Sequence, residues 1–323
     1  RHRLPVSATT AGLRATVMGP GRAADAAGIG ILYVVATPIG NLGDVTLRAI
    51  ETLQAVPLIA AEDTRLTKRL LDRHGIAGRL TSFHARSAPA RLTALLEHLR
   101  GGADLAVVTD AGTPGVSDPG MDLVAAWAAQ GGRVVPVPGA SAALAAVAAS
   151  GVAGPRWAFE GFLPRSGRER RERLAAIAAD ERGAVIFEAP GRVRATLRDL
   201  ATACGGARRA AVCRELTKLH EQIVRGTLAE LAGAVGAAAG DPGIPARGEF
   251  VLVVGMATDV DLRGAADATG AATADERLAA ALAEVARLVE DGAGRSEAAR
   301  RVAAATGIPR RRLYDVRAHQ EVG

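Results

Sequence analysis

The segment from Asp110 to Gly120 combines residue types that are typical of a ligand-binding loop. It reads Asp-Ala-Gly-Thr-Pro-Gly-Val-Ser-Asp-Pro-Gly, with three glycines, two prolines, a serine and two aspartates. The apolar run 105–109 before it predicts a buried strand, and residues 121–127 after it have helical spacing. In a parallel sheet such a loop lies at the carboxyl edge of its strand, where ligands bind. We therefore expect a rigid loop that approaches a ligand closely.

The chemistry of this loop argues against a phosphate-binding site. The chain has no GxxxxGK followed by Ser or Thr, and no GxGxxG between a strand and a helix. The carboxylates of Asp110 and Asp118 would repel a pyrophosphate unless a metal ion were present, which argues against an NAD or ATP site. Carboxylates, the Ser117 hydroxyl and backbone groups instead suit a ligand with hydroxyls, an ammonium group and a sulfonium. The alternative is that both aspartates only cap turns and a helix.

Other predicted strands in the first half of the chain also end in polar residues. Apolar runs alternate with segments of helical spacing, which predicts right-handed crossovers and a mainly parallel sheet. Asp44 is expected to be the N-cap of the first helix. The predicted strands are 31–36, 58–61, 79–83, 105–109 and 133–137. Polar segments follow at Thr37–Asn41, Glu62–Arg65 and Pro138–Ser141. Because parallel strands share a carboxyl edge, we expect these segments to meet the 110–120 loop.

The composition changes around residues 151–156, and a second α/β domain is predicted after them. The helix predicted at 166–182 alternates arginine and glutamate, which indicates a solvated face with local ion pairs. Residues 222–225 and 250–254 are expected to be antiparallel partners. Further strands are predicted at 157–162, 184–187 and 209–213. Two of these strands end in polar groups, at Glu188 and at Arg214–Lys218.

The C-terminal residues predict a small helical appendix. Apolar residues at helical spacing between 278 and 288 mark one helix, and Ser296 is expected to cap a second. A glycine-containing turn at 306–309 leads to a third helix that starts with Arg310, Arg311 and Arg312. This is the outline of a helix-turn-helix, and its arginines favour nucleic acid as the partner. The alternative is an ordinary helical bundle, which can have the same outline.

These patterns predict an α/β protein with two α/β domains and a C-terminal helical appendix. The expected parts are a disordered N-terminal extension (1–28), an N-terminal α/β domain with the ligand loop (29–152), a C-terminal α/β domain (153–256), a linker (257–274) and the helix-turn-helix-like appendix (275–323). The basic extension lacks the apolar core of a signal peptide, so we expect a disordered tail or an upstream start before Met18.

The overall composition points to an anionic partner and to no metal. The net charge is +6 and the pI is about 10.2, which favours nucleic acid. Because only two of the 40 basic residues are lysine, the charge can alternatively reflect the base composition of the coding DNA. Two cysteines without CxxC spacing and scattered histidines predict neither a disulfide scaffold nor a metal site. No apolar run approaches a membrane span, and a reducing cytoplasm is expected.

Six motifs of the sequence form a specific set, at 32–42, 58–65, 110–114 with 117–120, 134–139, 159–164 and 214–218. Together they resemble the tetrapyrrole methylase superfamily, and within it the subfamily that methylates small-subunit ribosomal RNA. They span more than two-thirds of the chain, and the C-terminal appendix resembles that subfamily as well. The sequence departs from the pattern at 187–191, which reads Phe-Glu-Ala-Pro-Gly where relatives often have Tyr-Glu-Ser, and in its N-terminal extension.

The resemblance implies that S-adenosylmethionine binds in a cleft between the two α/β domains. It also implies methyl transfer to the ribose 2′-oxygen of a cytidine in the decoding centre of 16S rRNA, cytidine 1402. Members of the superfamily are typically homodimers, so a homodimer is expected here. The residues that we predict to bind the cofactor are Pro38, Asp110, Ala111, Gly112, Ser117, Asp118, Ser141 and Ala142.

The acceptor chemistry is expected to come from the second domain. A carboxylate can take the proton of a ribose hydroxyl, and a cation can stabilise the developing alkoxide. The predicted catalytic residues are Glu188, Glu215 and Lys218, each of which can alternatively form an interdomain or dimer salt bridge. The predicted RNA-binding residues are Arg65, Lys68, Arg69, Arg310, Arg311 and Arg312.

Two other functions remain open at this point. One is a methylase of the same superfamily that acts on a tetrapyrrole precursor, against which the arginine-rich tail argues. The other is a non-catalytic nucleic-acid-binding protein built around the terminal helices, against which the intact 110–120 loop argues.

Overall fold

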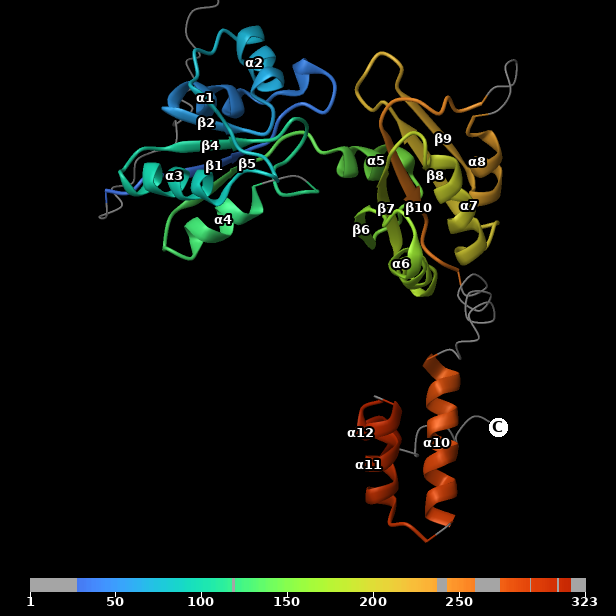
Figure 1. Ribbon diagram of the computed structural model, residues 1–323. Coiled ribbons are helices and arrows are strands. Elements are labelled where there is room, and N and C mark those ends of the chain that lie inside the picture. Colours follow the sequence, from blue (N-terminus) through green and yellow to red (C-terminus); the bar gives the residue numbers. More distant parts are fainter. Residues whose placement is uncertain are drawn as a thin grey trace, which may run out of the picture. The chain divides into compact units, whose positions relative to one another are not determined.

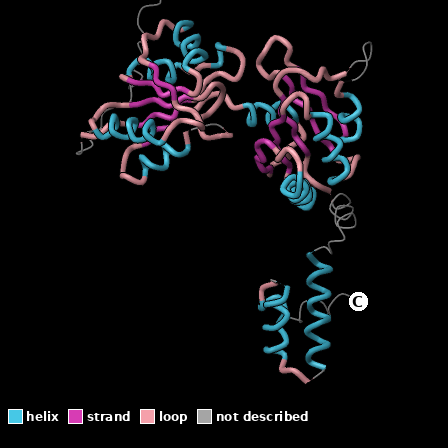
Figure 2. Tube along the Cα trace, viewed as in Figure 1, coloured by secondary structure: helices cyan, strands magenta, loops and turns pink. Residues whose placement is uncertain are grey.

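The computed structural model describes residues 28–117, 120–236, 243–258, 274–290, 292–306 and 308–314. Two five-stranded sheets flanked by helices account for most of them, followed by a group of C-terminal helices (Figures 1 and 2). The chain divides into two compact units, one ending at Ala142 and one starting at Ala143. The predicted α/β class with two α/β units is confirmed. The predicted N-terminal extension, most of the predicted linker and the predicted cofactor residue Asp118 lie outside the described residues.

The first sheet is entirely parallel, with strand order β3-β2-β4-β1-β5. Strand β4 is buried along its whole length, as expected for an apolar strand in the middle of a parallel sheet. The predicted parallel sheet is therefore confirmed, and all five carboxyl ends lie at one edge, called the carboxyl edge below. Its strands are β1 (Leu32–Val35), β2 (Leu58–Ala61), β3 (Leu80–Ser82), β4 (Leu105–Val108) and β5 (Val134–Val137).

Helices cover both faces of this sheet (Figure 1). Leu53 and Leu71, from α1 and α2, pack on one face, whereas Leu99 and Trp127, from α3 and α4, pack on the other. The helices are η1 (Leu42–Asp44, a 3-10 turn), α1 (Leu47–Ala55), α2 (Thr64–Arg73), α3 (Pro89–Arg100) and α4 (Met121–Ala128).

The predicted N-cap of the first helix is wrong by two residues. Asp44 is the last residue of η1, and the Thr46 hydroxyl caps α1 by accepting from the Ala49 N–H at 3.1 Å. The short 3-10 turn, which Asn41 caps through the Gly43 N–H, separates the strand from the helix.

The second sheet is mixed, with strand order β6-β7-β10-β8-β9. Strands β6 and β7 are parallel, and the other neighbours are antiparallel. The expected pairing of 222–225 with 250–254 is wrong, because β10 lies between β7 and β8 and β9 pairs with β8 only. All five residues of β10 are buried, which suits a central strand, whereas β9 is half-exposed at the edge. The strands are β6 (Trp157–Phe162), β7 (Gly183–Glu188), β8 (Arg209–Arg214), β9 (Gln222–Thr227) and β10 (Phe250–Val254).

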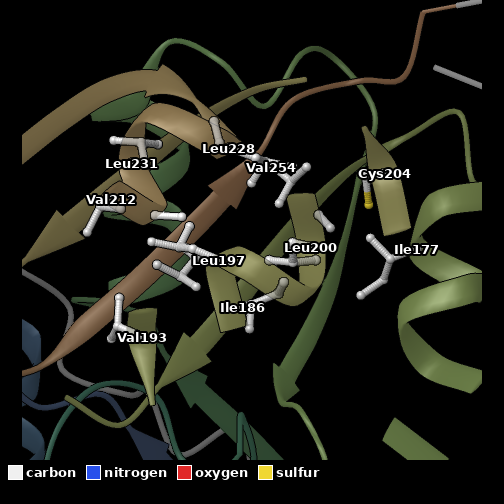
Figure 3. Close-up of a cluster of buried hydrophobic side chains, with 14 of the residues drawn as sticks. Ile177, Ile186, Val193, Leu197, Leu200, Cys204, Val212, Leu228, Leu231 and Val254 are labelled. Carbon is white, nitrogen blue, oxygen red and sulfur yellow. The ribbon is translucent and has the colours of Figure 1, made fainter. Parts of the chain in front are cut away.

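The core of the second unit lies between this sheet and the helices α6, α7 and α8 (Figure 3). Leu197 and Leu200 of α7 are fully buried against Ile186 of β7 and Val212 of β8. The helices of this unit are α5 (Ala142–Ser150), α6 (Gly167–Ala179), α7 (Val193–Cys204) and α8 (Leu228–Ala234).

One arginine of the charged helix α6 contradicts the expected solvated face. Arg170 is buried, and its guanidinium donates to Asp199 at 2.7 and 2.9 Å, to Thr196 Oγ1 at 3.0 Å and to the Pro164 carbonyl at 2.9 Å. The exposed pair Arg168–Glu172 does conform to the expectation. The alternation of arginine and glutamate therefore predicts most of α6 correctly. It does not identify Arg170, whose hydrogen bonds fix this helix in place.

Three C-terminal helices form a small cluster of their own, α10 (Ala274–Glu290), α11 (Arg295–Thr306) and α12 (Arg310–Tyr314). Val285, Val302 and Leu313 are buried within it. Ser296 lies inside α11 rather than at its cap, and its hydroxyl accepts from Arg310 Nη2 at 2.5 Å. Among the described residues, no helix is both long and apolar enough to cross a membrane.

Candidate functional site

The carboxyl edge of the first sheet brings together the polar segments that the sequence placed after its strands. Thr37 follows β1, and its N–H donates to the Gly112 carbonyl at 2.8 Å while the Gly112 N–H donates back at 3.0 Å. The Thr37 hydroxyl also donates to the Thr109 carbonyl at 3.0 Å. The loop after β4 is thus fixed to the end of β1 by three hydrogen bonds, as a rigid ligand loop requires.

Asp110 connects the same loop to the end of β2. Its carboxylate accepts from the Asp63 N–H at 2.8 Å, and its own N–H donates to Glu62 Oε2 at 3.3 Å. Burial raises the pKa of Glu62, and the charges of Asp110 and Asp63 raise it further, while the Asp110 N–H and His84 oppose the rise. The carboxylates of Glu62 and Asp110 therefore lie together at this edge, and the field that they create favours a cation.

Several residues of the 110–120 loop have positive φ values, which restrict the residue types that can occupy these positions. Gly112 and Gly115 have φ values of 82° and 85°, which favour glycine. Ser117 has a φ of 66°, which is uncommon for a residue with a side chain. Strain of this kind persists where the surrounding structure imposes it and is concentrated at ligand sites.

The end of β5 completes the edge. The Thr113 hydroxyl donates to the Ala140 carbonyl at 3.4 Å, which joins the loop to the segment after β5. A Cβ on Gly139 would lie 3.0 Å from the Ala36 Cβ, so glycine allows this segment to pack against the end of β1. Ser141 and Ala142, half-exposed, follow at the start of α5.

The predicted cofactor residues that the structure describes all lie along this edge, but they differ in accessibility. Asp110, Ala111 and Ser117 are exposed, whereas Pro38 and Gly112 are buried. The exposed residues can contact a ligand directly, and the buried ones shape the backbone that does so.

A pocket that the sequence did not reveal opens at the same edge. Its volume is about 350 Å³, and its lining comes from the segment after β3 and the first turns of α3 and α4. The available signal was Ser82 and His84 at the end of the strand predicted at 79–83, and no ligand site is predicted there from the sequence.

The predicted RNA-binding residues of α2 lie just after Asp63. The Asp63 side chain caps this helix through the Arg65 N–H at 2.8 Å and pairs with the Arg65 guanidinium at 2.6 Å. Hydrogen bonds from Arg65 hold the pKa of Asp63 far below its usual value. Lys68 pairs with Asp72, and Arg69 is exposed. Arg310, Arg311 and Arg312 form the exposed first turn of α12.

In the second unit, Glu188 is engaged within the protein. Its side chain has no exposed surface, and its oxygens accept from Thr196 Oγ1 at 2.6 Å and from the Ala189 N–H at 2.8 Å. Arg192 Nε lies 3.2 Å away. These contacts join the end of β7 to the start of α7, which favours a positioning role for this carboxylate.

Glu215 and Lys218 form a charged network in the loop after β8. Lys218 Nζ lies 2.9 Å from Glu215 Oε1 and 2.9 Å from Glu249 Oε2, and the Glu249 N–H donates to Glu215 at 2.9 Å. This backbone N–H and Lys218 lower the pKa of Glu215. Burial lowers the pKa of Lys218, but hydrogen bonds to Glu249 and Glu215 more than offset it and raise the pKa. Lys218 is therefore cationic and Glu215 ionised at neutral pH.

The same loop carries backbone strain. Glu215 and Thr217 have φ values of 50° and 67°, and a positive φ is a genuine outlier for the β-branched threonine. The buried Arg214 holds the loop by donating to the Arg247 carbonyl at 2.7 Å and to the His220 carbonyl at 3.2 Å. Two strained loops, one in each unit, thus follow the strands β4 and β8.

The chemistry at the carboxyl edge fits S-adenosylmethionine better than a nucleotide phosphate. The carboxylates of Asp110 and Glu62 would repel phosphate but attract an ammonium or a sulfonium group.

Comparisons with known proteins agree with this geometry. The family model of Tetrapyrrole (Corrin/Porphyrin) Methylases matches residues 31–232. The chain is 46% identical to "Ribosomal RNA small subunit methyltransferase I" of Synechocystis sp. over 89% of this chain and 97% of the relative. It is 40% identical to the Bacillus subtilis protein of the same name, over 89% and 94% of the two chains.

Solved structures are similar in fold. The methyltransferase CobJ has a TM-score of 0.53 and 23% identity over 71% of this chain and 95% of its own. Diphthine synthase has a TM-score of 0.53 and 16% identity over 74% of this chain and 96% of its own. With the family model matching well over half of the chain and near full-length relatives above 40% identity, this protein is a methyltransferase and belongs to the tetrapyrrole (corrin/porphyrin) methylase family.

Proposed function

We propose that this methyltransferase transfers the methyl group of S-adenosylmethionine, its cofactor, to the ribose 2′-oxygen of a cytidine in the decoding centre of 16S ribosomal RNA. The observation that carries the proposal is the similarity to relatives named for small-subunit ribosomal RNA, at 46% identity over 97% of the relative's length. The exposed carboxylate edge of the first sheet supports the choice of cofactor.

The cofactor is held by the first sheet in this proposal. Asp110 accepts from an amino or hydroxyl group of the cofactor, and the backbone of Ala111 and the Ser117 hydroxyl add further contacts at the exposed face of the loop. S-adenosylmethionine supplies a methyl group activated by its sulfonium. The rigid attachment of the loop to β1 and β2 keeps these contacts in place, because an in-line displacement depends on alignment.

The acceptor chemistry is assigned to the charged network after β8. A ribose hydroxyl is a weak nucleophile, so it gains from a proton acceptor and from a cation near the developing charge. In the reaction the new C–O bond forms as the C–S bond breaks, and the hydroxyl proton passes to a base. Ionised Glu215 suits the base and cationic Lys218 suits the stabilisation of oxygen charge. Glu188 suits neither role as well, because it is buried among its own partners.

RNA phosphates are bound by exposed arginines and a lysine in this proposal. Arg65, Lys68 and Arg69 on α2 follow directly after the carboxyl edge of β2. The first turn of α12 adds Arg310, Arg311 and Arg312. Contacts between these side chains and phosphates give an affinity for RNA that falls as the salt concentration rises. They do not distinguish one RNA sequence from another.

We also propose that the active form is a homodimer. The second unit exposes large apolar side chains at Leu219 (93%), Leu144 (58%) and Phe162 (57%), which suit a protein contact. Sedimentation equilibrium should give twice the chain mass, and Leu219→Glu should shift the population toward monomer. A monomeric wild-type protein would overturn this part of the proposal.

Transfer of labelled methyl groups tests the activity. Small ribosomal subunits that lack the modification should accept label from S-adenosylmethionine, and nuclease digestion with mass spectrometry should place it on the ribose of one cytidine. Label on a tetrapyrrole precursor instead would indicate the other branch of the family. RNA binding without transfer of label to the RNA would overturn the proposed acceptor.

A further inference from the structure

The activity proposed above does not yet use the pocket beside the 110–120 loop. Its volume of about 350 Å³ is at the lower end of the range for ligand pockets. Phe83 lies buried at its side, and Leu92 and the mostly exposed Met121 add apolar surface. Its lining combines these apolar groups with three polar side chains, His84, Ser87 and Asp122, a composition that suits a flat, uncharged ligand with a polar edge.

Two of the polar side chains are set as hydrogen-bond donors by the backbone around them. His84 Nδ1 accepts from the Arg86 N–H at 3.2 Å, which assigns the ring proton to Nε2 and makes that nitrogen a donor. Ser87 Oγ accepts from the His84 N–H at 2.9 Å, which leaves its hydroxyl proton to donate elsewhere. The turn that contains both residues is therefore preorganised with two donors.

The third polar side chain acts only as an acceptor. Asp122 is exposed in the first turn of α4, where a carboxylate is stabilised by the helix dipole. It disfavours a phosphate in this pocket and favours an amino group. The lining therefore presents one acceptor and two donors, together with the thioether of Met121, which packs well against an aromatic ring.

This set of groups matches the Watson–Crick edge of cytosine. Cytosine presents an amino donor at N4 and acceptors at N3 and O2, and a carboxylate is a known partner of the N4 amino group. Uracil presents an oxygen in place of the amino group, which would face the Asp122 carboxylate without a hydrogen. Unstacked RNA bases are commonly read on this edge while their rings pack against side chains.

We propose that this pocket receives a cytosine base of the RNA substrate, with Asp122 accepting from N4 and with His84 Nε2 and the Ser87 hydroxyl donating to N3 and O2. The inference rests on the proposed RNA methyltransferase function and adds the residues that choose the base. It also explains why a donor turn and a carboxylate lie together beside the cofactor loop.

Base selectivity tests the proposal. Small subunits with the target cytidine, or with uridine in its place, would be compared as methyl acceptors by kcat/KM. Wild-type protein should prefer cytidine at least tenfold, and Asp122→Ala should reduce that ratio by about tenfold, since a good base contact is worth roughly that much. Asp122→Asn should lower the ratio further by offering a donor to uracil O4. Ser87→Ala should raise KM several-fold and leave kcat nearly unchanged.

A matched control and a binding measurement complete the test. Glu97→Ala removes an exposed carboxylate from α3 outside the pocket lining, and it should behave as wild type. Calorimetry should give the same affinity for S-adenosylmethionine in every variant, and thermal melts should show folded protein.

Fluorescence anisotropy measures the base preference of the pocket without any methyl transfer. The probe is a short decoding-centre oligonucleotide that carries cytidine or uridine at the target position. A preference for cytidine that depends on Asp122 would support the assignment of the pocket to the base, even if no methyl transfer were observed. The absence of methyl transfer would refute only the proposed activity. Equal affinities for the two oligonucleotides, or a preference unchanged in the Asp122 variants, would overturn the inference.

Discussion

The ends of the two sheets carry similar polar residues but use them in different ways. At the carboxyl edge of the first sheet, Asp110 is exposed and connects neighbouring strands mainly through backbone groups. At the end of β7 in the second sheet, Glu188 has no exposed surface and its oxygens are occupied by Thr196, Ala189 and Arg192. A polar residue at a strand end is therefore a ligand candidate only when its partners leave it accessible.

The largest expected effect is on stability, from Glu188→Ala. The substitution removes the acceptor of the Thr196 hydroxyl and of the Ala189 N–H, and it removes the carboxylate beside Arg192 Nε. The free energy of unfolding should therefore fall by about 3 kcal/mol in urea titrations. Glu172→Ala, which removes an exposed pair with Arg168, should cost less than about 0.5 kcal/mol. If Glu188→Ala left the stability unchanged but abolished methyl transfer, Glu188 would belong to the functional site. The ends of the strands in both sheets would then serve the same purpose.

The next effect is on cofactor binding, from Asp110→Ala. Loss of a charged acceptor at the exposed edge should weaken S-adenosylmethionine binding by about ten- to hundredfold in calorimetry, while the protein stays folded. Asp72→Ala on α2 is the matched control and should bind the cofactor normally. An affinity equal to wild type in the Asp110 variant would remove this residue from the cofactor site.

A smaller effect is expected on RNA affinity, from replacing Arg310, Arg311 and Arg312 with glutamine. If all three contact phosphates, the slope of log affinity against log salt should become shallower by about 2. The exposed arginines Arg168 and Arg171 of α6, replaced in the same way, provide the control. A slope that does not change would assign α12 to packing within the C-terminal helices.

The smallest effect concerns acid stability and Glu215. Because its pKa is lowered from 4.5 in the folded protein, the carboxylate stabilises the fold above that pH, and this contribution is lost as the pH falls through the lowered value. Glu215→Gln should therefore flatten the loss of unfolding free energy as the pH falls below 4.5, and the effect should be small because solvent screens the group. An identical acid profile in the variant would mean that Lys218 and Glu249 do not stabilise the charge.

The first sheet could be predicted well from the sequence. The apolar periodicity and the polar segments after the strands both indicate a parallel sheet there. Apolar runs with helices between them leave little choice but a parallel sheet, and the loop after β4 then has only one edge to occupy. The second sheet was harder, because an apolar run such as β10 does not reveal which neighbours it has. Complete burial of β10 between β7 and β8 became visible only in the structure.

Individual side chains were predicted less well than the elements that carry them. In the sequence Arg170 is one of many arginines expected on the surface. Its partners Asp199 and Thr196 lie on α7, so the sequence pattern of α6 alone does not indicate them. Arg208 is also buried, and its guanidinium donates to the carbonyls of Gly255 and Arg182. Tertiary partners of this kind are set by packing, so charge patterning along one helix cannot identify them.

The gathering of Glu62 and Asp110 at one edge has a consequence for turnover. S-adenosylmethionine carries a positive sulfonium, and the thioether product that remains after methyl transfer does not. With the cofactor at this edge, as proposed, the carboxylates attract the reactant more than the product. The charges that favour binding before the reaction would then disfavour the product after it. Product inhibition should therefore be weak, and it should grow as salt screens the carboxylates.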